Sequence, residues 1–213
     1  MSKIRSAEKI SEEIRNKIFV KELFPGSQIV EDELAKNSGV SRTVVRNAMI
    51  LLQREGLITI IPNKGSFVIN PAKKDVVSFY QVREYLELGV GELAINRITA
   101  EQLSRMEENY ASQMDLLHDF SIEKYAVLNR EFHWIIVEAA DNEFYAKYLQ
   151  ELYNIQRMYL IFFDKSKNNA NSLKNHRSIL DGLKEKNFEK YKEGVIGDCD
   201  IRNGYGDSGA AYF

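Results

Sequence analysis

One segment, residues 40–56 (VSRTVVRNAMILLQREG), constrains the fold of this chain more strongly than any other part of the sequence. Ser41 is a residue type that caps helix N-termini and Gly56 is one that ends helices, so the segment predicts a helix from Ser41 to about Glu55. Apolar residues recur at helical spacing within it and predict one buried face, formed by Val45, Ala48, Met49 and Leu52. This face requires other elements to pack against, and the flanking sequence supplies them.

Two shorter helices are predicted before this segment. The first follows from an apolar stripe at Ala7, Ile10, Ile14 and Ile18. The pair Pro25-Gly26 predicts a turn after it. Residues 31–38 predict the second helix, which ends at Gly39 because glycine is the usual residue at a helix C-terminus.

A β-hairpin is predicted after Gly56. Two β-prone runs, 57–61 and 66–70, flank the turn sequence Pro62-Asn63-Lys64-Gly65. Three helices followed by a hairpin make a winged helix-turn-helix, a fold that inserts its last helix into the major groove of DNA.

The chain changes character after residue 75, where helical stripes replace all β signals. The predicted helices cover residues 77–96, 101–117, 122–140, 144–163 and 173–186, and another begins near Phe188. We therefore predict a mainly α protein: a winged helix-turn-helix at 1–70, a linker at 71–75, and an all-helical bundle for ligand binding and dimerisation at 76–213. Aromatic residues beyond the needs of one thin bundle predict a homodimer; they are Phe79, Tyr80, Tyr85, Tyr148, Tyr153 and Tyr159.

Charge divides the chain at the same place. Residues 1–70 carry 11 basic and 8 acidic residues, whereas residues 71–213 carry 18 basic and 23 acidic ones. A mildly basic part joined to an acidic part indicates two tasks on one chain. The single cysteine, Cys199, excludes an internal disulfide, and no stretch has the apolar character of a signal peptide or a membrane span. We expect a cytoplasmic protein with no membrane partner.

Polar residues near the start of the 41–55 helix are candidates for DNA contact. Arg42, Thr43 and Arg46 lie off its apolar face; arginine can bind guanine or phosphate, and threonine can contact phosphate or a thymine methyl. Ser41 and the free amides at the helix start suit a phosphate. The Lys64-Gly65 turn adds a charge and a close backbone approach. The alternative for the arginines is an ordinary solvated helix face.

Few residues of the acidic part suggest chemistry. His133 follows Asn129 by four positions, so both lie on one helix face, and His176 lies on a separate predicted helix. Residues from several helices that converge inside a bundle are how such domains build metal or ligand sites. Arg83, in a half-apolar helix, could meet an anion inside the bundle. The alternatives are core histidines with one hydrogen bond each and a surface or salt-bridge arginine.

The N-terminal segment resembles the GntR family of bacterial transcription regulators. The similarity runs through PGSQIVEDELAKNSGVSRTVVRNAMILLQREGLITIIPNKGSFV, including the Gly39-Val40-Ser41-Arg42-Thr43 run and Glu55-Gly56-Leu57. Val44 and Asn47 depart from the family pattern, which has proline and glutamate there. By analogy, the positions that contact DNA are Arg42, Thr43, Arg46, Lys64 and Gly65.

The acidic part resembles the FCD ligand-binding domain of FadR-type GntR regulators. The similarity rests on Arg83–Glu87, Asn129–His133, Ala139–Asn142 and Asn175–Ile179. In metal-binding members the ligands are an Asp and three His; the matching set here is Asn129, His133, His176 and, by counting, about Asp198. The resemblance implies a divalent ion such as Zn, Ni or Mn, held less tightly than by three histidines.

Together these features predict a ligand-responsive transcription regulator of a metabolic operon, more commonly a repressor in this family. It would bind operator DNA as a homodimer and sense a small organic acid, whose carboxylate is held by a metal or by Arg83, with Asn129, His133 and His176 in the same pocket. One alternative is a DNA-binding dimer without an effector. A metal-dependent enzyme is the other, although the sequence has no H-E-x-x-H, nucleophile motif or phosphate loop.

Overall fold

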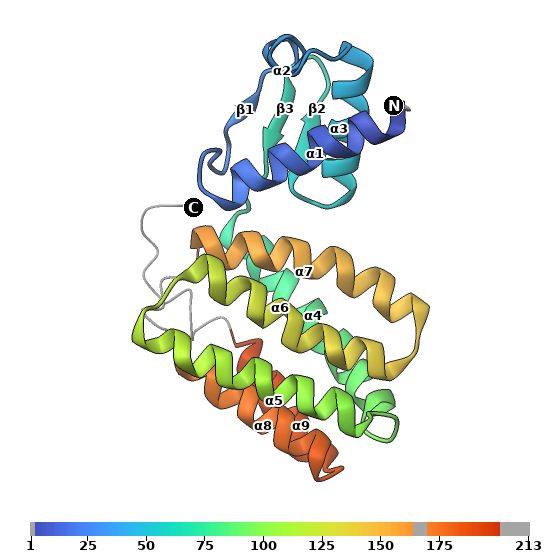
Figure 1. The fold of residues 1–213 in the computed structure, drawn as a ribbon, viewed down its shortest axis with the longest axis vertical. Helices are drawn as coiled ribbons and strands as arrows, with labels where there is room; N and C mark the ends of the chain where they lie inside the picture. Colours follow the sequence, from blue (N-terminus) through green and yellow to red (C-terminus); the bar gives the residue numbers. More distant parts are fainter. Residues whose placement is uncertain (1–2, 164–169, 201–213) are drawn as a thin grey trace.

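The computed structural model describes residues 3–163 and 170–200 and confirms the predicted fold class. Figure 1 shows a small α/β unit above a helical bundle. The upper unit holds helices α1 (Lys3–Phe19), α2 (Glu31–Ser38) and α3 (Arg42–Arg54), followed by strands β2 (Ile58–Ile61) and β3 (Gly65–Val68). Helices followed by a hairpin are the predicted winged helix-turn-helix.

The hairpin is part of a three-stranded antiparallel sheet in the order β1-β3-β2. The third strand, β1 (Gln28–Ile29), pairs Gln28 with Phe67 and Ile29 with Ser66. The sequence did not predict this strand because two residues are too short for any alternation of polar and apolar side chains. By holding the outer edge of β3, β1 fixes the hairpin beside α2 and α3.

Helix α3 begins and ends as its sequence predicted. The Oγ of Ser41 accepts a hydrogen bond from the amide of Val44 at 3.4 Å, and the predicted apolar face is buried. Before it, Gly39 ends α2 with φ +63°, a left-handed conformation that favours glycine. Arg15 of α1 donates to both carboxylate oxygens of Glu55, at 2.9 and 2.7 Å, and so joins α1 to the end of α3.

The lower unit is helical throughout the part that the structure describes after β3. Its elements are α4 (Lys73–Ala94), α5 (Ala100–Asp115), the short 3-10 turn η1 (Leu116–His118), α6 (Ile122–Ala140), α7 (Glu143–Phe163), α8 (Ala170–Lys184) and α9 (Phe188–Asp198). These agree with the predicted stripes to within two residues at each end, apart from the starts of α4 and α8, which begin four and three residues earlier than predicted. No helix in the described ranges is long and apolar enough to cross a bilayer.

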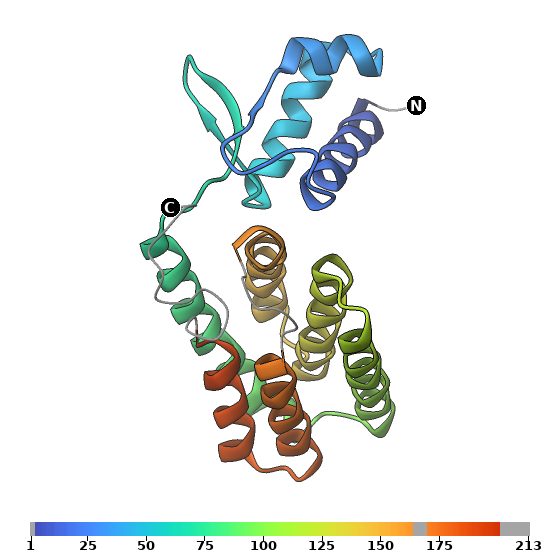
Figure 2. The same ribbon diagram turned by 90° about the vertical axis from the view of Figure 1, so that its left-hand side faces the viewer.

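Helix α7 lies directly below the winged helix-turn-helix, and α8 and α9 lie at the far end of the bundle (Figures 1 and 2). The guanidinium of Arg157 in α7 stacks 3.9 Å from the ring centroid of Phe19 in α1. Phe162 of α7 meets Phe24 edge to face at 6.0 Å. An ion pair of 2.9 Å between Lys21 and Glu123 joins α6 to the upper unit.

Helix α9 packs closely against α8 because small residues line the contact. A Cβ at Gly194 would lie 2.8 Å from the carbonyl oxygen of Asn175, closer than real Cβ atoms approach. The ring of Tyr191 in α9 lies over Gly91 of α4, and its hydroxyl donates to the carbonyl of Glu87 at 2.9 Å. These contacts bring the end of α9 against α4 and α8.

The aromatic residues predicted for a dimer surface divide into two groups. Phe79, Tyr80, Tyr153 and Tyr159 are buried within the chain's own core. The prediction that the bundle cannot bury all six aromatic residues by itself was therefore wrong for these four. They fill the space between α4 and α7; Phe79 and Tyr159, for example, meet edge to face at 5.0 Å. Tyr85 and Tyr148 are exposed by 75% and 50%.

Candidate functional site

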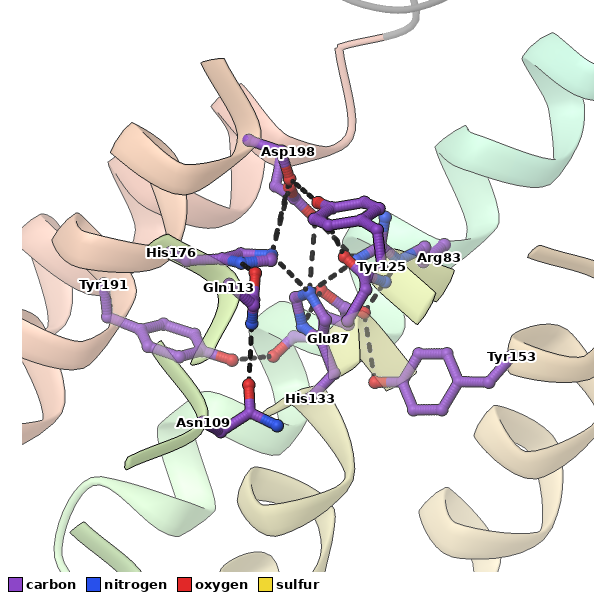
Figure 3. A network of polar contacts seen from close by, with 12 residues as sticks. Arg83, Glu87, Asn109, Gln113, Tyr125, His133, Tyr153, His176, Tyr191 and Asp198 are labelled. Atoms are coloured by element: carbon purple, nitrogen blue, oxygen red, sulfur yellow. Dashed lines mark hydrogen bonds and ion pairs between the residues drawn. The ribbon is translucent and has the colours of Figure 1, made fainter. Parts of the chain in front are cut away.

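A buried polar centre lies where α4, α6, α8 and α9 meet (Figure 3). Arg83 of α4, His133 of α6, His176 of α8 and Asp198 of α9 meet there, and all four side chains are 3% exposed or less. The Nε2 atoms of His133 and His176 are 3.2 Å apart. Oxygens of Asp198 lie 3.3 Å from His133 Nε2 and 3.4 Å from His176 Nε2.

Arg83 is the cation of this centre. Its Nε donates to Glu87 Oε1 at 2.8 Å, its Nη2 donates to Asp198 Oδ2 at 2.7 Å, and the same Nη2 lies 3.1 Å from His133 Nε2. The alternative of a surface arginine is therefore wrong, whereas the salt bridge is present. Burial would lower the pKa of Arg83, but Glu87 and Asp198 outweigh burial and raise the pKa well above its usual value.

The two carboxylates of the centre, Asp198 and Glu87, have different partners besides Arg83. Burial alone would raise the pKa of Asp198, but the charge of Arg83 opposes burial, and the pKa lies well below its usual range. Glu87 Oε1 also accepts a hydrogen bond from the hydroxyl of Tyr153 in α7, at 3.0 Å. Glu87 had a sequence signal, because it follows Arg83 by four positions on one helix face.

Asn129 joins the centre through hydroxyl groups. It is buried, and its Oδ1 accepts from the hydroxyl of Tyr125 at 3.2 Å. The same hydroxyl lies 2.6 Å from Ser172 Oγ, which in turn donates to Asp198 Oδ1 at 2.6 Å. The structure thus gathers Arg83, Asn129, His133, His176 and Asp198 around one centre. Sequence reasoning did not find Tyr125 or Ser172, because no local pattern marks a hydroxyl that faces a helix from another part of the chain.

The donor set fits a divalent cation. His133, His176 and Asp198 each offer one ligand atom, and these atoms lie within 4.8 Å of one another. Zinc bonds of about 2.0–2.1 Å place two ligand atoms of a tetrahedral site about 3.3–3.4 Å apart, close to the spacings seen here. Arg83 Nη2 already lies against two of the three candidate ligands, so a bound cation and Arg83 would compete for His133 and Asp198.

The second group of predicted residues lies on the surface of the winged helix-turn-helix. Arg42, Thr43 and Arg46 are exposed at the start of α3, and Lys64 is exposed in the hairpin turn. Arg42 forms a fork-like ion pair with Asp32 of α2, with two contacts of 2.8 Å. Arg46 lines a groove of about 670 Å³ between α3 and the hairpin.

The tip of the hairpin has the backbone that its sequence predicted. Gly65 has φ +107°, which disfavours other residues, and a Cβ there would lie 3.2 Å from Gln28 Nε2. Gln28 Nε2 also donates to the carbonyl of Lys64 at 3.1 Å and so holds the turn against β1. Arg46 of α3 and residues Pro62, Asn63 and Gly65 of the hairpin turn line the same groove.

A winged helix-turn-helix joined to a helical bundle is the architecture of a two-part DNA-binding regulator. The family of bacterial regulatory proteins named gntR matches residues 6–68, and the FCD domain family matches residues 78–195. The chain belongs to the GntR family, in the group with an FCD domain, and is a DNA-binding transcription regulator of that family.

Individual relatives agree with this assignment. The chain is 29% identical over 194 residues to the HTH-type transcriptional regulator YdhC of Bacillus subtilis (strain 168). This match covers 88% of the present chain and 87% of the relative. It is 27% identical over 163 residues to the HTH-type transcriptional repressor RspR of Escherichia coli (strain K12), covering 76% and 72%. Among solved structures, E. coli McbR/YncC shares the fold with a TM-score of 0.77 at 20% identity, covering 95% of each chain.

Proposed function

We propose that the protein is a ligand-responsive regulator that represses a metabolic operon and is relieved by a small organic acid. In this proposal residues 1–70 bind operator DNA, residues 71–75 link the two parts, and residues 76–213 bind the effector and form the dimer. One observation carries the proposal: a single chain holds an exposed, cationic recognition helix and a buried centre whose donor atoms suit a cation and an anion. Operator binding assigns the protein to the cytoplasm, where bacterial DNA lies.

The DNA contacts are proposed at Ser41, Arg42, Thr43, Arg46, Lys64 and Gly65. Arg46 is the proposed base-reading residue, because its side chain is exposed and lines the groove between α3 and the hairpin. Arg42 is a proposed phosphate contact whose pair with Asp32 would have to open, at a small cost because both side chains are exposed. Ser41 and the first amides of α3 would hold a neighbouring phosphate.

The effector site is proposed at the buried polar centre. His133, His176 and Asp198 would hold a divalent cation such as Zn, Ni or Mn, with Asn129 near them. A bound cation would act as a Lewis acid that holds a carboxylate of the organic acid. Arg83, once displaced from His133 and Asp198, would be a second group that can bind the carboxylate, since a guanidinium matches it with two parallel hydrogen bonds.

Helix α7 offers a physical connection between this centre and the DNA-binding unit. Tyr153 of α7 donates to Glu87 in the centre, and two residues further along Ile155 lies against Gly56, at the end of the recognition helix. Arg157, on the next turn, stacks on Phe19. We propose that effector binding alters the position of α7 and, through it, the relative placement of the two recognition helices in a dimer.

The proposed dimer surface lies on α4 and α7. Val82 and Tyr85 of α4 and Phe144 and Tyr148 of α7 are large apolar residues that are 50–75% exposed. The two helices are neighbours, since the Tyr145 hydroxyl lies against Gly89. A two-fold operator requires two recognition helices at a fixed spacing, which a dimer through the helical part would supply.

Mapping of bound DNA across the genome, with the full chain and with Arg46→Ala, tests the proposal. Wild type should enrich a few two-fold sequences, and the variant should lose them. Arg54→Ala is the matched control, because Arg54 is exposed at the other end of the same helix. Enrichment that is equal for wild type and Arg46→Ala would refute this assignment of the recognition helix. Release of the operator by none of a panel of organic acids would favour the effector-free dimer.

A further inference from the structure

A line of polar side chains runs from His176 through Gln113 to Asn109 (Figure 3) and continues to Glu131 at the protein surface. His176 Nδ1 lies 2.8 Å from Gln113 Oε1, and Gln113 Nε2 donates to Asn109 Oδ1 at 2.7 Å. Asn109 Nδ2 then donates to Glu131 Oε2 at 3.5 Å. Gln113 and Asn109 lie one turn apart on α5 and are 1% and 9% exposed, whereas Glu131 of α6 is exposed.

The direction of these hydrogen bonds is fixed from the surface end. The Oε2 atom of Glu131 accepts from Asn109 Nδ2, so Asn109 presents its NH2 group to this carboxylate. The Asn109 carbonyl oxygen therefore faces Gln113 and accepts from the Gln113 NH2 group. The Gln113 carbonyl oxygen then faces His176, and His176 must donate through Nδ1–H.

This direction determines which nitrogen of His176 faces the polar centre as a lone pair. Neutral imidazole carries one proton, so a proton on Nδ1 leaves Nε2 unprotonated. The Nε2 lone pair then points toward His133 Nε2 and Asp198 Oδ1, at 3.2 and 3.4 Å. Nε2 of His133 is likewise unprotonated, because it accepts a hydrogen bond from Arg83 Nη2. Two lone pairs and a carboxylate thus converge on one point.

We propose that Gln113 is a positioning residue that holds His176 in the Nδ1–H tautomer and thereby sets the cation affinity of the centre, with Asn109 and Glu131 orienting Gln113. The inference rests on the proposed cation site, since it concerns how that site is tuned. Partners of this kind fix the ring orientation and tautomer of a metal-binding histidine, and their loss typically costs 10- to 100-fold in metal affinity.

Charge reversal at the surface tests the whole line without disturbing the core. In Glu131→Lys the residue at 131 can only donate, which would turn the Asn109 amide, then the Gln113 amide, and place the His176 proton on Nε2. A proton there blocks the cation. We expect about tenfold weaker Zn²⁺ binding by calorimetric titration and a change of the His176 tautomer in ¹⁵N NMR of the metal-free protein. Glu108→Lys is the matched control, because it makes the same charge change beside Asn109 and Glu108 is not part of the line.

Two variants of Gln113 separate hydrogen bonding from packing. Gln113→Leu should weaken Zn²⁺ binding by about 10- to 100-fold and give a mixture of His176 tautomers. Gln113→Glu, which still accepts from Nδ1–H, should keep the tautomer and retain wild-type affinity or better. A wild-type protein that binds none of Zn²⁺, Ni²⁺ and Mn²⁺ would refute the proposed cation site, whereas the tautomer measurement would still test Gln113. An unchanged tautomer and unchanged affinity in both Glu131→Lys and Gln113→Leu would overturn the inference.

Discussion

Replacement of Arg83 by methionine tests the balance of charge in the polar centre. Methionine keeps much of the apolar stem of arginine but removes the guanidinium. In the wild-type protein that group donates to Glu87 Oε1 at 2.8 Å and to Asp198 Oδ2 at 2.7 Å, and all three side chains are 3% exposed or less. The variant therefore leaves two buried carboxylates without their cation.

The expected loss follows from this burial. Removal of one partner from a buried ion pair costs about 3–5 kcal/mol in the free energy of unfolding. A protein of 150–250 residues changes its melting temperature by about 2–4 °C per kcal/mol. Arg83→Met should therefore melt roughly 6–20 °C below wild type in the presence of a chelator.

A divalent cation should reverse much of this loss. It would neutralise Asp198 and would no longer compete with Arg83 for Asp198 and His133. A ligand that binds only the folded state stabilises it more strongly the more tightly it binds. Zn²⁺ should therefore raise the melting temperature of Arg83→Met more than that of wild type.

Differential scanning calorimetry of both proteins, with chelator and with Zn²⁺, makes the measurement. Arg105→Met is the control, because Arg105 and its partner Glu138 are 48% and 37% exposed, and exposed pairs contribute about 1 kcal/mol or less. The reasoning is refuted if metal-free Arg83→Met melts within the range of this control. It is also refuted if Zn²⁺ stabilises the variant less than it stabilises wild type.

Three further predictions concern DNA, assembly and the metal. Arg46→Ala should weaken operator binding by about 1–3 kcal/mol in a gel-shift titration at fixed salt while leaving the melting temperature unchanged, because the side chain is exposed; undiminished affinity would contradict it. Tyr85→Lys should shift the full chain from dimer to monomer in sedimentation, because a buried charge at an apolar contact has no partner, whereas Met114→Lys, a change at an exposed residue of α5, should not. Asn129→Asp should tighten Zn²⁺ binding in a calorimetric titration by adding a charged oxygen beside His133; weaker binding would show that Asn129 lies outside the ligand set.

Local signals in the sequence determined the DNA-binding unit. A capping serine at 41 and glycines at 39 and 56, with φ +63° and +71°, act within a few residues, so they fix where the helices begin and end. The spacing of Val45, Ala48, Met49 and Leu52 then fixes the face that packs. Strand β1 lacked such a signal, because its two residues are held by pairing with β3, about 38 positions further along the chain.

The same kind of signal determined half of the polar centre. Asn129 and His133 share a helix face because they are four residues apart, and the pair Arg83 and Glu87 has the same spacing. The placement of His176 near His133 followed from a resemblance to the FCD domain, and the position of Asp198 from counting along it. No periodicity within one helix relates residues on α6, α8 and α9 to each other.

Only the tertiary structure decided how these residues meet. The close approach of α9 at Gly194 brings Asp198 to within 3.4 Å of His176, and the buried position of Arg83 makes it the partner of Asp198 rather than a surface charge. Gln113 reaches His176 from α5, a helix without any residue that the sequence marked for the site. The physical reason is that helix periodicity encodes which side chains face inward, whereas the packing of helices determines which of them touch.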